Sequence, residues 1–172
     1  MNLEKKERIG VQSVQNREGG MSVALDEIDV RILNVLAGNA DITSTELAAQ
    51  VSLSIPAVNK RVAKLHASGV IRRTTILTDA KAVGKPVTAY VLVIMERFSG
   101  SDRLLESAAA DPDILECYAI TGEYDYILKI CASDIDELEK KILTLKSRGV
   151  AKSNTMFTLR EHKFSPIVLP EE

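Results

Sequence analysis

The chain has 172 residues, of which 45% are hydrophobic and 27% are charged, a balance typical of a soluble globular protein with one or two domains. No apolar run approaches the roughly 18 residues that a membrane-spanning helix needs, and the N-terminus lacks the apolar core of a signal peptide. Cys117 and Cys131 lack the spacing of a metal site or a redox pair. We therefore expect buried thiols in a reducing cytoplasm, with no metal and no cofactor.

Charge is distributed unevenly, although the formal net charge is only −2. No Asp or Glu occurs from Leu47 to Thr78, whereas acids outnumber bases from Thr88 to Glu161. A locally positive surface on a mildly acidic molecule predicts a polyanionic partner, such as nucleic acid, for one part of the chain only.

The N-terminal residues 1–20 are polar and end in a glycine pair, which predicts a flexible arm. The first helix is predicted after it, in the segment LDEIDVRILNVLAGN. Ile28, Ile32 and Leu36 recur there at helical spacing, and Asp26 precedes them as an N-cap.

Two further helices are predicted in ITSTELAAQV and SIPAVNKRVAKLHASG. Thr43 and Glu46 have the spacing of a capping box at the start of the former. Ser54 can cap the latter, on which Val58, Val62 and Leu65 form a buried stripe. A tight turn joins the two, and the second is basic on its outer face, which predicts a helix-turn-helix. The segment VIRRTTILT that follows predicts a β-segment, either a wing or a hinge strand.

The basic helix has the residue types that reading DNA requires. A helix in the major groove needs polar side chains at base edges and cations at phosphate distance. Asn59 is the best candidate for base contacts, whereas Arg61, beside Val58 and Val62, could brace the fold instead. Cations on a solvated helix face are common, but the acid-free window favours DNA binding. The predicted DNA-contacting residues are Ser54, Pro56, Asn59, Lys60, Arg61, Lys64, Arg72 and Arg73, of which Lys60, Lys64, Arg72 and Arg73 are assigned to phosphates.

A second domain is predicted after a linker at residues 79–87, which contains Gly84 and Pro86. The DNA-binding domain is then predicted at 21–78 and the second domain at 88–172. The apolar patterns of the second domain follow the order βαββαβ, which predicts a ferredoxin-like α+β fold with a four-stranded antiparallel sheet and two helices on one face.

The first strand of this unit, VTAYVLVIME, is apolar on both faces. Val91 and Val93 lie on one face, and Leu92 and Ile94 lie on the other. Because two helices can cover only one face of the sheet, the other face needs a partner, and a second copy of the chain is the simplest one. We therefore expect a homodimer.

The stretch AITGEYDYILKI sets a glycine and two acids between two apolar runs. Gly122 can adopt positive φ, and Glu123 and Asp125 can lie in a hairpin turn, so the stretch alone favours a simple turn over a binding loop. Paired carboxylates are also compatible with acid–base catalysis, but His66 and His162 have no neighbours at metal-like spacing. We expect that the protein is not an enzyme.

Four segments, in their order, resemble the Lrp/AsnC (feast/famine) family of transcriptional regulators: LDEIDVRIL, ELAAQVSLSIPAVNKRVAKLHASGVI, TGEYDYILKI and GVAKSNTMFTLREHK. The resemblance spans Leu25 to about Lys163. Two departures are visible. The segment NADIT lacks an arginine often found before the second helix, and LKSRGV replaces the more usual Leu-Pro-Gly-Val. Neither departure touches the predicted DNA helix or the glycine loop.

The resemblance implies a winged helix-turn-helix joined to a ligand-responsive domain, with dimers that often assemble into octamers. It also implies a small effector, usually an amino acid, bound between dimers, and so favours a binding loop over a simple turn. The implied effector-binding residues are Thr121, Gly122, Glu123, Tyr124, Asp125, Ser153, Asn154 and Thr155. The expected function is a cytoplasmic, nucleoid-associated regulator that binds specific DNA sequences and whose oligomeric state or DNA affinity responds to the effector.

Two other functions stay open from the sequence. Some haem-pathway decarboxylases resemble this family and bind a tetrapyrrole, but that chemistry needs histidine or arginine in a large pocket, and no histidine lies between Ala67 and Glu161. The other is an architectural DNA-compacting protein that has no effector.

Overall fold

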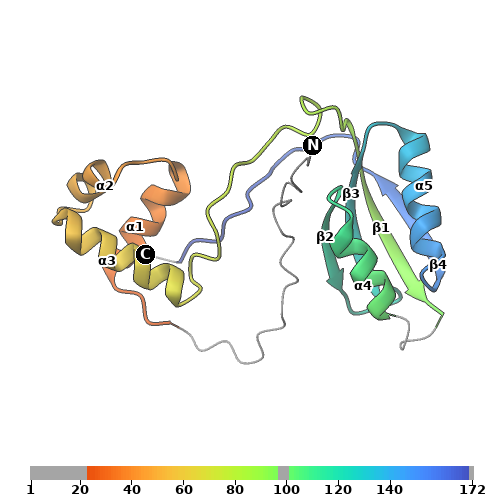
Figure 1. Cartoon of the computed structure of the whole chain (residues 1–172), viewed down its shortest axis with the longest axis horizontal. Helices are drawn as coiled ribbons and strands as arrows, with labels where there is room; N and C mark the ends of the chain where they lie inside the picture. The colour runs from red at the N-terminus through yellow and green to blue at the C-terminus, as the bar shows by residue number, and fades with distance from the viewer. Residues whose placement is uncertain (1–22, 97–100, 171–172) are drawn as a thin grey trace, which may run out of the picture. The chain divides into compact units, whose positions relative to one another are not determined.

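The computed structural model describes residues 23–96 and 101–170. The predicted arm at 1–20 lies outside the described residues. Within the described ranges, no helix is long and apolar enough to cross a membrane. The elements, in chain order, are α1 (Glu27–Gly38), α2 (Ser44–Gln50), α3 (Ile55–Ala67), β1 (Val87–Met95), α4 (Ser101–Ala110), β2 (Ile114–Ala119), β3 (Tyr126–Ala132), α5 (Ile135–Lys146) and β4 (Val150–Phe157) (Figure 1).

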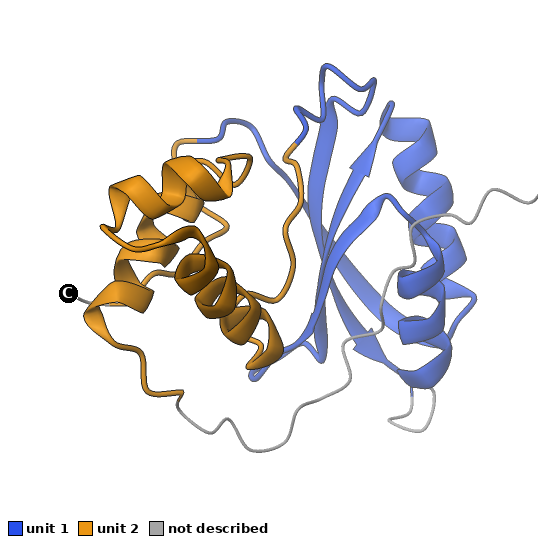
Figure 2. Ribbon diagram, turned by 60° about the vertical axis from the view of Figure 1, so that its left-hand side comes forward, with its two compact units in different colours: residues 1–16, 78–161 blue, residues 17–77, 162–172 orange. Residues whose placement is uncertain are grey.

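The chain divides into two compact units (Figure 2). One runs from Thr78 to Glu161 and contains the sheet, and the other contains the three N-terminal helices up to Leu77 together with the residues from His162 onward. The break between the units thus falls at the start of the predicted linker. The predicted domain boundaries at 21–78, 79–87 and 88–172 stay predictions.

In the helical unit, α1, α2 and α3 each begin at a side-chain cap. The Asp29 amide donates to the Asp26 carboxylate at 2.8 Å, and the Glu46 amide donates to the Thr43 hydroxyl at 3.2 Å, each within a reciprocal capping box. Ser54 caps α3. The three predicted helices and their predicted caps are confirmed. Their core consists of Ile32, Leu47, Ala48, Val51, Val58 and Leu65.

The β-segment expected between Val70 and Thr78 is not formed. Val70 and Ile71 pack against the helical core, but residues 72–79 are exposed. A strand needs a neighbouring strand to satisfy its amides and carbonyls. Among the described residues of this unit there is no such neighbour, so the segment remains irregular.

The unit from Thr78 to Glu161 has the predicted βαββαβ arrangement. Its strands are antiparallel in the order β2-β3-β1-β4, and α4 and α5 cover one face (Figure 2). The two central strands, β1 and β3, supply fully buried residues to the core, including Val91, Val93 and Leu128. The predicted ferredoxin-like fold is confirmed.

The opposite face of the sheet is apolar as well. Leu92 and Ile94 of β1 and Ile127 of β3 are only partly buried there. The register places Tyr118 opposite Ile127 and Met156 opposite Tyr90 on the same face. Tyr118 is 57% exposed and Met156 is 47% exposed, so much of this apolar face lies open in the single chain.

Candidate DNA-binding helix and effector loop

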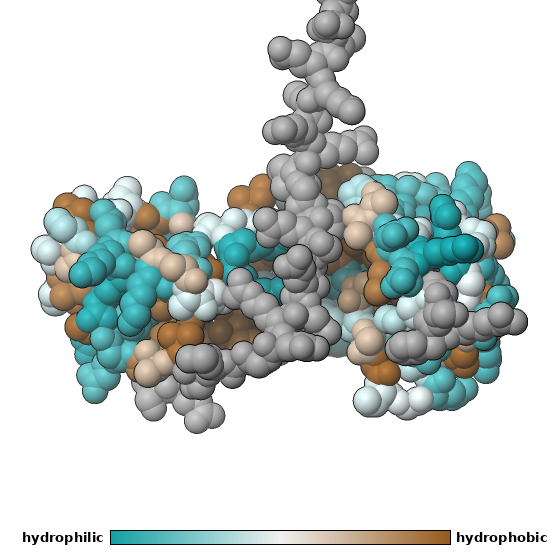
Figure 3. All heavy atoms as spheres, turned by 60° about the horizontal axis from the view of Figure 1, so that its bottom comes forward, coloured by the Kyte–Doolittle hydropathy of each residue, from teal (hydrophilic) through white to brown (hydrophobic). Residues whose placement is uncertain are grey.

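Helix α3 presents its polar residues outward because its apolar stripe is fixed in the core. Val58 and Leu65 are fully buried, and Val62 packs beside them. Asn59, Lys60 and Lys64 therefore lie on the exposed side. Figure 3 shows that hydrophilic residues, in teal, make up much of the visible surface of the molecule. The predicted base-reading and phosphate-contacting residues of the helix are thus brought to one surface.

Apart from Arg61, the remaining predicted DNA contacts lie at the start of α3 and after its end. Ser54 and Pro56 are exposed at its start, where the Ser54 hydroxyl accepts from the Ala57 amide at 3.4 Å. Arg72 and Arg73 are exposed after its end. Among the described residues, Lys60, Lys64, Arg72 and Arg73 take part in none of the ion pairs.

Arg61 differs from the other cations of the window. Its guanidinium lies 2.7 Å from a carboxylate oxygen of Asp26 and 2.7 Å from one of Asp29. The hydrogen bonds to Asp26 and Asp29 raise the pKa of Arg61, and the same bond from Arg61 lowers the pKa of Asp26. Its role as a DNA contact stays a prediction, while the geometry is that of the bracing alternative.

The glycine loop between β2 and β3 is a closed turn. Gly122 has φ +115°, the positive value predicted for it, and no neighbouring atom would meet a Cβ there. The Ile120 amide donates to the Asp125 carbonyl at 3.0 Å, which closes the turn. The backbone of this loop therefore depends on its glycine.

Asp125 ties the turn to the end of β1. Its amide donates to the Val93 carbonyl at 2.9 Å, and its carboxylate accepts from the Met95 amide at 2.7 Å. The side chain is half-buried rather than solvated. Sequence reasoning missed this anchor, because Met95 lies 30 positions away and no local pattern connects the two residues.

The predicted effector residues do not form one pocket within a single chain. Thr121, Gly122 and Glu123 are exposed at the turn, while Tyr124 and Asp125 are half-buried. On β4, Ser153 and Thr155 pair with Val93 and Val91 and so face the helices, whereas Asn154 pairs with Leu92 and faces the open side. The predicted residues therefore meet at one end of the sheet but on two of its faces.

Known proteins match both units. Family models for a winged helix-turn-helix DNA-binding domain and for the Lrp/AsnC ligand binding domain match residues 25–72 and 88–168. The HTH-type transcriptional regulator FL11 of Pyrococcus horikoshii is 33% identical over 144 residues, which cover 83% of this chain and 95% of FL11. This chain belongs to the Lrp/AsnC family of transcriptional regulators. It is therefore a DNA-binding regulator with an effector-binding domain, and the family resemblance is confirmed.

Further regulatory proteins are similar to this chain. The glutamate uptake regulatory protein of Zymomonas mobilis is 32% identical over 151 residues, which cover 86% of this chain and 92% of that protein. A Neisseria meningitidis transcriptional regulator, solved in complex with L-Met, has a TM-score of 0.78 and 29% identity, and the match covers 83% of this chain and 95% of that one. LrpC of B. subtilis has a TM-score of 0.76, also at 29% identity, covering 82% and 99%.

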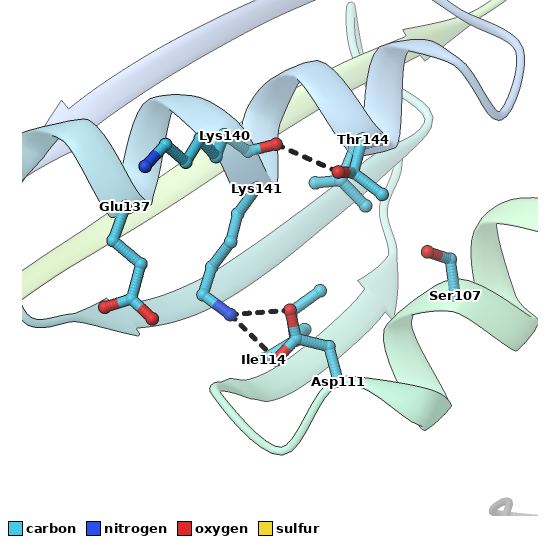
Figure 4. A pocket seen from close by; sticks show the side chains of 8 residues that line it. Ser107, Asp111, Ile114, Glu137, Lys140, Lys141 and Thr144 are labelled. Atoms are coloured by element: carbon cyan, nitrogen blue, oxygen red, sulfur yellow. Dashed lines mark hydrogen bonds and ion pairs between the residues drawn. The ribbon is translucent and has the colours of Figure 1, made fainter.

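Two grooves in the effector-binding unit of this Lrp/AsnC chain are lined by residues outside the glycine loop. One, of about 300 Å³, lies between α4 and α5 (Figure 4). There the Lys141 ammonium is 2.7 Å from the Asp111 carboxylate, so these charges are already matched. The other, of about 410 Å³, lies between α5 and β4 and includes Thr155 of the predicted set. Among the described residues, no cluster could hold a metal ion.

An ion-pair network borders the first groove, and sequence reasoning missed it. Lys85 lies 3.0 Å from Asp113 and 2.8 Å from Glu137, and Lys141 bridges Asp113 and Asp111. The hydrogen bond from Lys85, assisted by the Ser133 amide, lowers the pKa of Glu137 to about 2. The partners come from the linker, from the turn between α4 and β2 and from α5, so no sequence spacing could reveal them.

Proposed function

We propose that this Lrp/AsnC regulator recognises specific duplex DNA through the outer face of α3. We further propose that an amino acid bound at the glycine loop changes its DNA affinity or its oligomeric state. One observation carries the proposal: the cations of the acid-free window, apart from Arg61, are exposed and take part in no ion pair among the described residues. A phosphate backbone would neutralise them and release its counterions.

The proposed contacts divide by chemistry. Asn59 offers an amide that can pair with a base edge, and the cations reach the phosphates on either side. Ser54 and Pro56 lie at the helix N-terminus, where the backbone itself favours a phosphate. The residues proposed to contact DNA are Ser54, Pro56, Asn59, Lys60, Lys64, Arg72 and Arg73.

Salt-dependent binding tests these roles. Lys60→Ala or Lys64→Ala should weaken binding to every duplex and lower the slope of log K against log salt by about 0.9 for each phosphate that the variant no longer neutralises. Asn59→Ala should relax base preference at one position in each half-site instead. Affinity and preference unchanged in all three variants would show that α3 is not the reading helix.

The open face of the sheet supports a proposed homodimer. Leu92, Ile94 and Ile127 lie on it with Tyr118 and Met156, and water would otherwise contact this apolar area. A second copy offers the same complementary face under two-fold symmetry. The family resemblance extends the proposal to dimers that assemble into an octamer.

A multi-chain assembly also accounts for the divided effector residues. Their side chains lie on two faces at one end of the sheet, so a neighbouring copy is needed to enclose a ligand. The amide of Gly122 can meet a carboxylate, and carboxylate oxygens of the loop can meet an ammonium. A related regulator bound to L-Met supports an amino acid as the effector.

A melting experiment separates the proposed sensor from its rivals. A specific effector must stabilise the folded protein by mass action, so one or a few of the twenty amino acids should raise the melting temperature in proportion to the logarithm of concentration. No response to any amino acid would favour the architectural alternative. A coloured protein with bound tetrapyrrole would favour the enzyme and contradict the proposal that the chain is a non-enzymatic regulator, acting in the cytoplasm at the nucleoid.

A further inference from the structure

Arg61 lies on the inner side of the DNA-binding helix. It follows the buried Val58 by three residues and precedes the buried Leu65 by four, spacings that place all three on one side of a helix. Its side chain is 29% exposed, whereas Lys60 and Lys64 lie open to solvent. The direction of Arg61 is therefore toward α1 and away from the outer surface.

One nitrogen of Arg61 joins two elements. Its Nη1 atom donates to Asp26 Oδ2 and to Asp29 Oδ1, both at 2.7 Å. The other oxygens of these carboxylates serve the capping box of α1: Asp26 Oδ1 accepts from the Asp29 amide at 2.8 Å, and Asp29 Oδ2 accepts from the Asp26 amide at 3.5 Å. All four carboxylate oxygens are thus engaged, and the start of α1 and the inner side of α3 share one charged cluster.

Burial commits Arg61 to this cluster. The Asp29 side chain is 2% exposed, and a buried carboxylate without a charged partner is strongly unfavourable. If Arg61 turned outward to a phosphate, the buried Asp29 carboxylate would lose its charged partner. The exposed lysines of α3 form no ion pair among the described residues, so they can bind phosphates without disrupting an interaction inside the domain.

We propose that Arg61 is a positioning residue for DNA recognition, which fixes the rotation of α3 against α1 and makes no phosphate contact of its own. The contacts of Val58 and Leu65 are apolar and hold the helix in place without strong directionality. Charge-assisted hydrogen bonds from one guanidinium to two fixed carboxylates are directional and therefore set the rotation. A small rotation of α3 would move Asn59 along the groove floor and away from its base. The inference rests on the DNA-binding function of α3.

The test uses two variants that keep side-chain volume, Arg61→Lys and Asp29→Asn, with Lys60→Ala as the matched control for a phosphate-binding residue. Affinity is measured for a duplex selected from genomic fragments by the wild-type protein and for a random duplex of equal length. Both are titrated over a salt series, at a temperature where circular dichroism shows each variant folded. Wild-type discrimination between the two duplexes is measured first, and its absence would overturn sequence-specific binding itself, separately from the role of Arg61.

Arg61→Lys and Asp29→Asn should each weaken binding to the selected duplex about five- to tenfold, change binding to the random duplex little, and leave the salt slope unchanged. Lys60→Ala should weaken binding to both duplexes and lower the slope by about 0.9 for each phosphate left without its cation. The direction of the affinity change in Asp29→Asn separates the two roles of Arg61, since this variant removes a negative charge near the DNA-binding helix. Tighter binding with a steeper slope would show that Asp29 restrains a phosphate-contacting Arg61, and would overturn the proposal. Unchanged discrimination in both folded variants would also overturn it, because the cluster would then only stabilise the domain.

Discussion

At the scale of single residues, Asp125 anchors the glycine loop to β1. The sequence allowed a solvated turn residue, a ligand for an effector's ammonium, or a residue that holds the backbone of the loop, but it did not indicate the partner. In the structure its carboxylate accepts from the Met95 amide at 2.7 Å, at the point where β1 ends. The residue therefore holds the loop in place, and any effector would meet a carboxylate that is already oriented.

Replacing Asp125 tests this anchor. In Asp125→Ala the Met95 amide loses its acceptor, and we expect the free energy of unfolding to fall by about 1–3 kcal/mol. Asp125→Asn keeps an acceptor oxygen and should be destabilised less. Urea denaturation of the three proteins measures both differences. If the free energy of unfolding fell by less than about 0.5 kcal/mol in Asp125→Ala, Asp125 would be an ordinary surface residue of a turn.

At the scale of elements, the network around Lys85 joins the linker to α5 and to the turn before β2. Glu137 contributes through a pKa of about 2, well below its ordinary value of 4.5. A carboxyl whose pKa is lowered by folding stabilises the folded state above its unfolded pKa and loses that contribution as the pH falls toward its folded pKa. The contribution of Glu137 is therefore complete above about pH 5 and disappears between pH 4.5 and 2.

The variant Glu137→Gln should remove this pH dependence. Above about pH 5 it should be less stable than the wild type, and the difference between the two should narrow as the pH falls from 4.5 toward 2. Denaturation midpoints measured across that range give the comparison. A constant difference at every pH would mean that the Glu137 charge does not stabilise the fold.

Neighbouring residues of β1 distinguish folding from assembly. Val91 is fully buried beneath the helices, whereas Leu92 lies on the open apolar face. Val91→Asp should abolish folding, because it buries an unpaired charge. Leu92→Asp should leave the secondary structure intact and dissociate the proposed dimer.

Circular dichroism and light scattering of the full chain measure the two outcomes. The Leu92→Asp protein should be a folded monomer at micromolar concentration. If it remained dimeric, the open face of the sheet would not be the interface. If both variants unfolded alike, the two faces would not differ in the way that the single chain indicates.

At the scale of the whole molecule, the sequence predicted those features whose determinants lie close together in the chain. The caps Asp26, Thr43 and Ser54 were predictable because each bonds within three residues of itself, and the order of strands and helices follows from local periodicity. The ion pairs of Lys85 in the linker were not predictable, since its partners Asp113 and Glu137 lie 28 and 52 residues away in the sequence. Patterns in sequence do not encode such distances.

The proposed effector site differs from these features, because its residues were named by resemblance and not by a local pattern. The resemblance placed its residues at one end of the sheet, and the register of β4 against β1 brings Ser153 and Asn154 there, although on opposite faces. The single chain does not complete a pocket from them. The resemblance implied a site between copies of the chain, as proposed above, whereas the residue pattern of the loop alone favoured a simple turn.

The exposed segment from residue 72 to residue 79 separates two complete hydrophobic cores. Every buried residue of one core lies before this segment and every buried residue of the other lies after it. A protease that cuts here should release two fragments that each retain a melting transition, which limited trypsin digestion at Arg72 and Arg73 followed by calorimetry would show. The same property makes the gene divisible. Recombination within these few codons could join the DNA-reading half of one regulator to the sensing half of another without disturbing either core, and so redirect a metabolic signal to a new set of promoters.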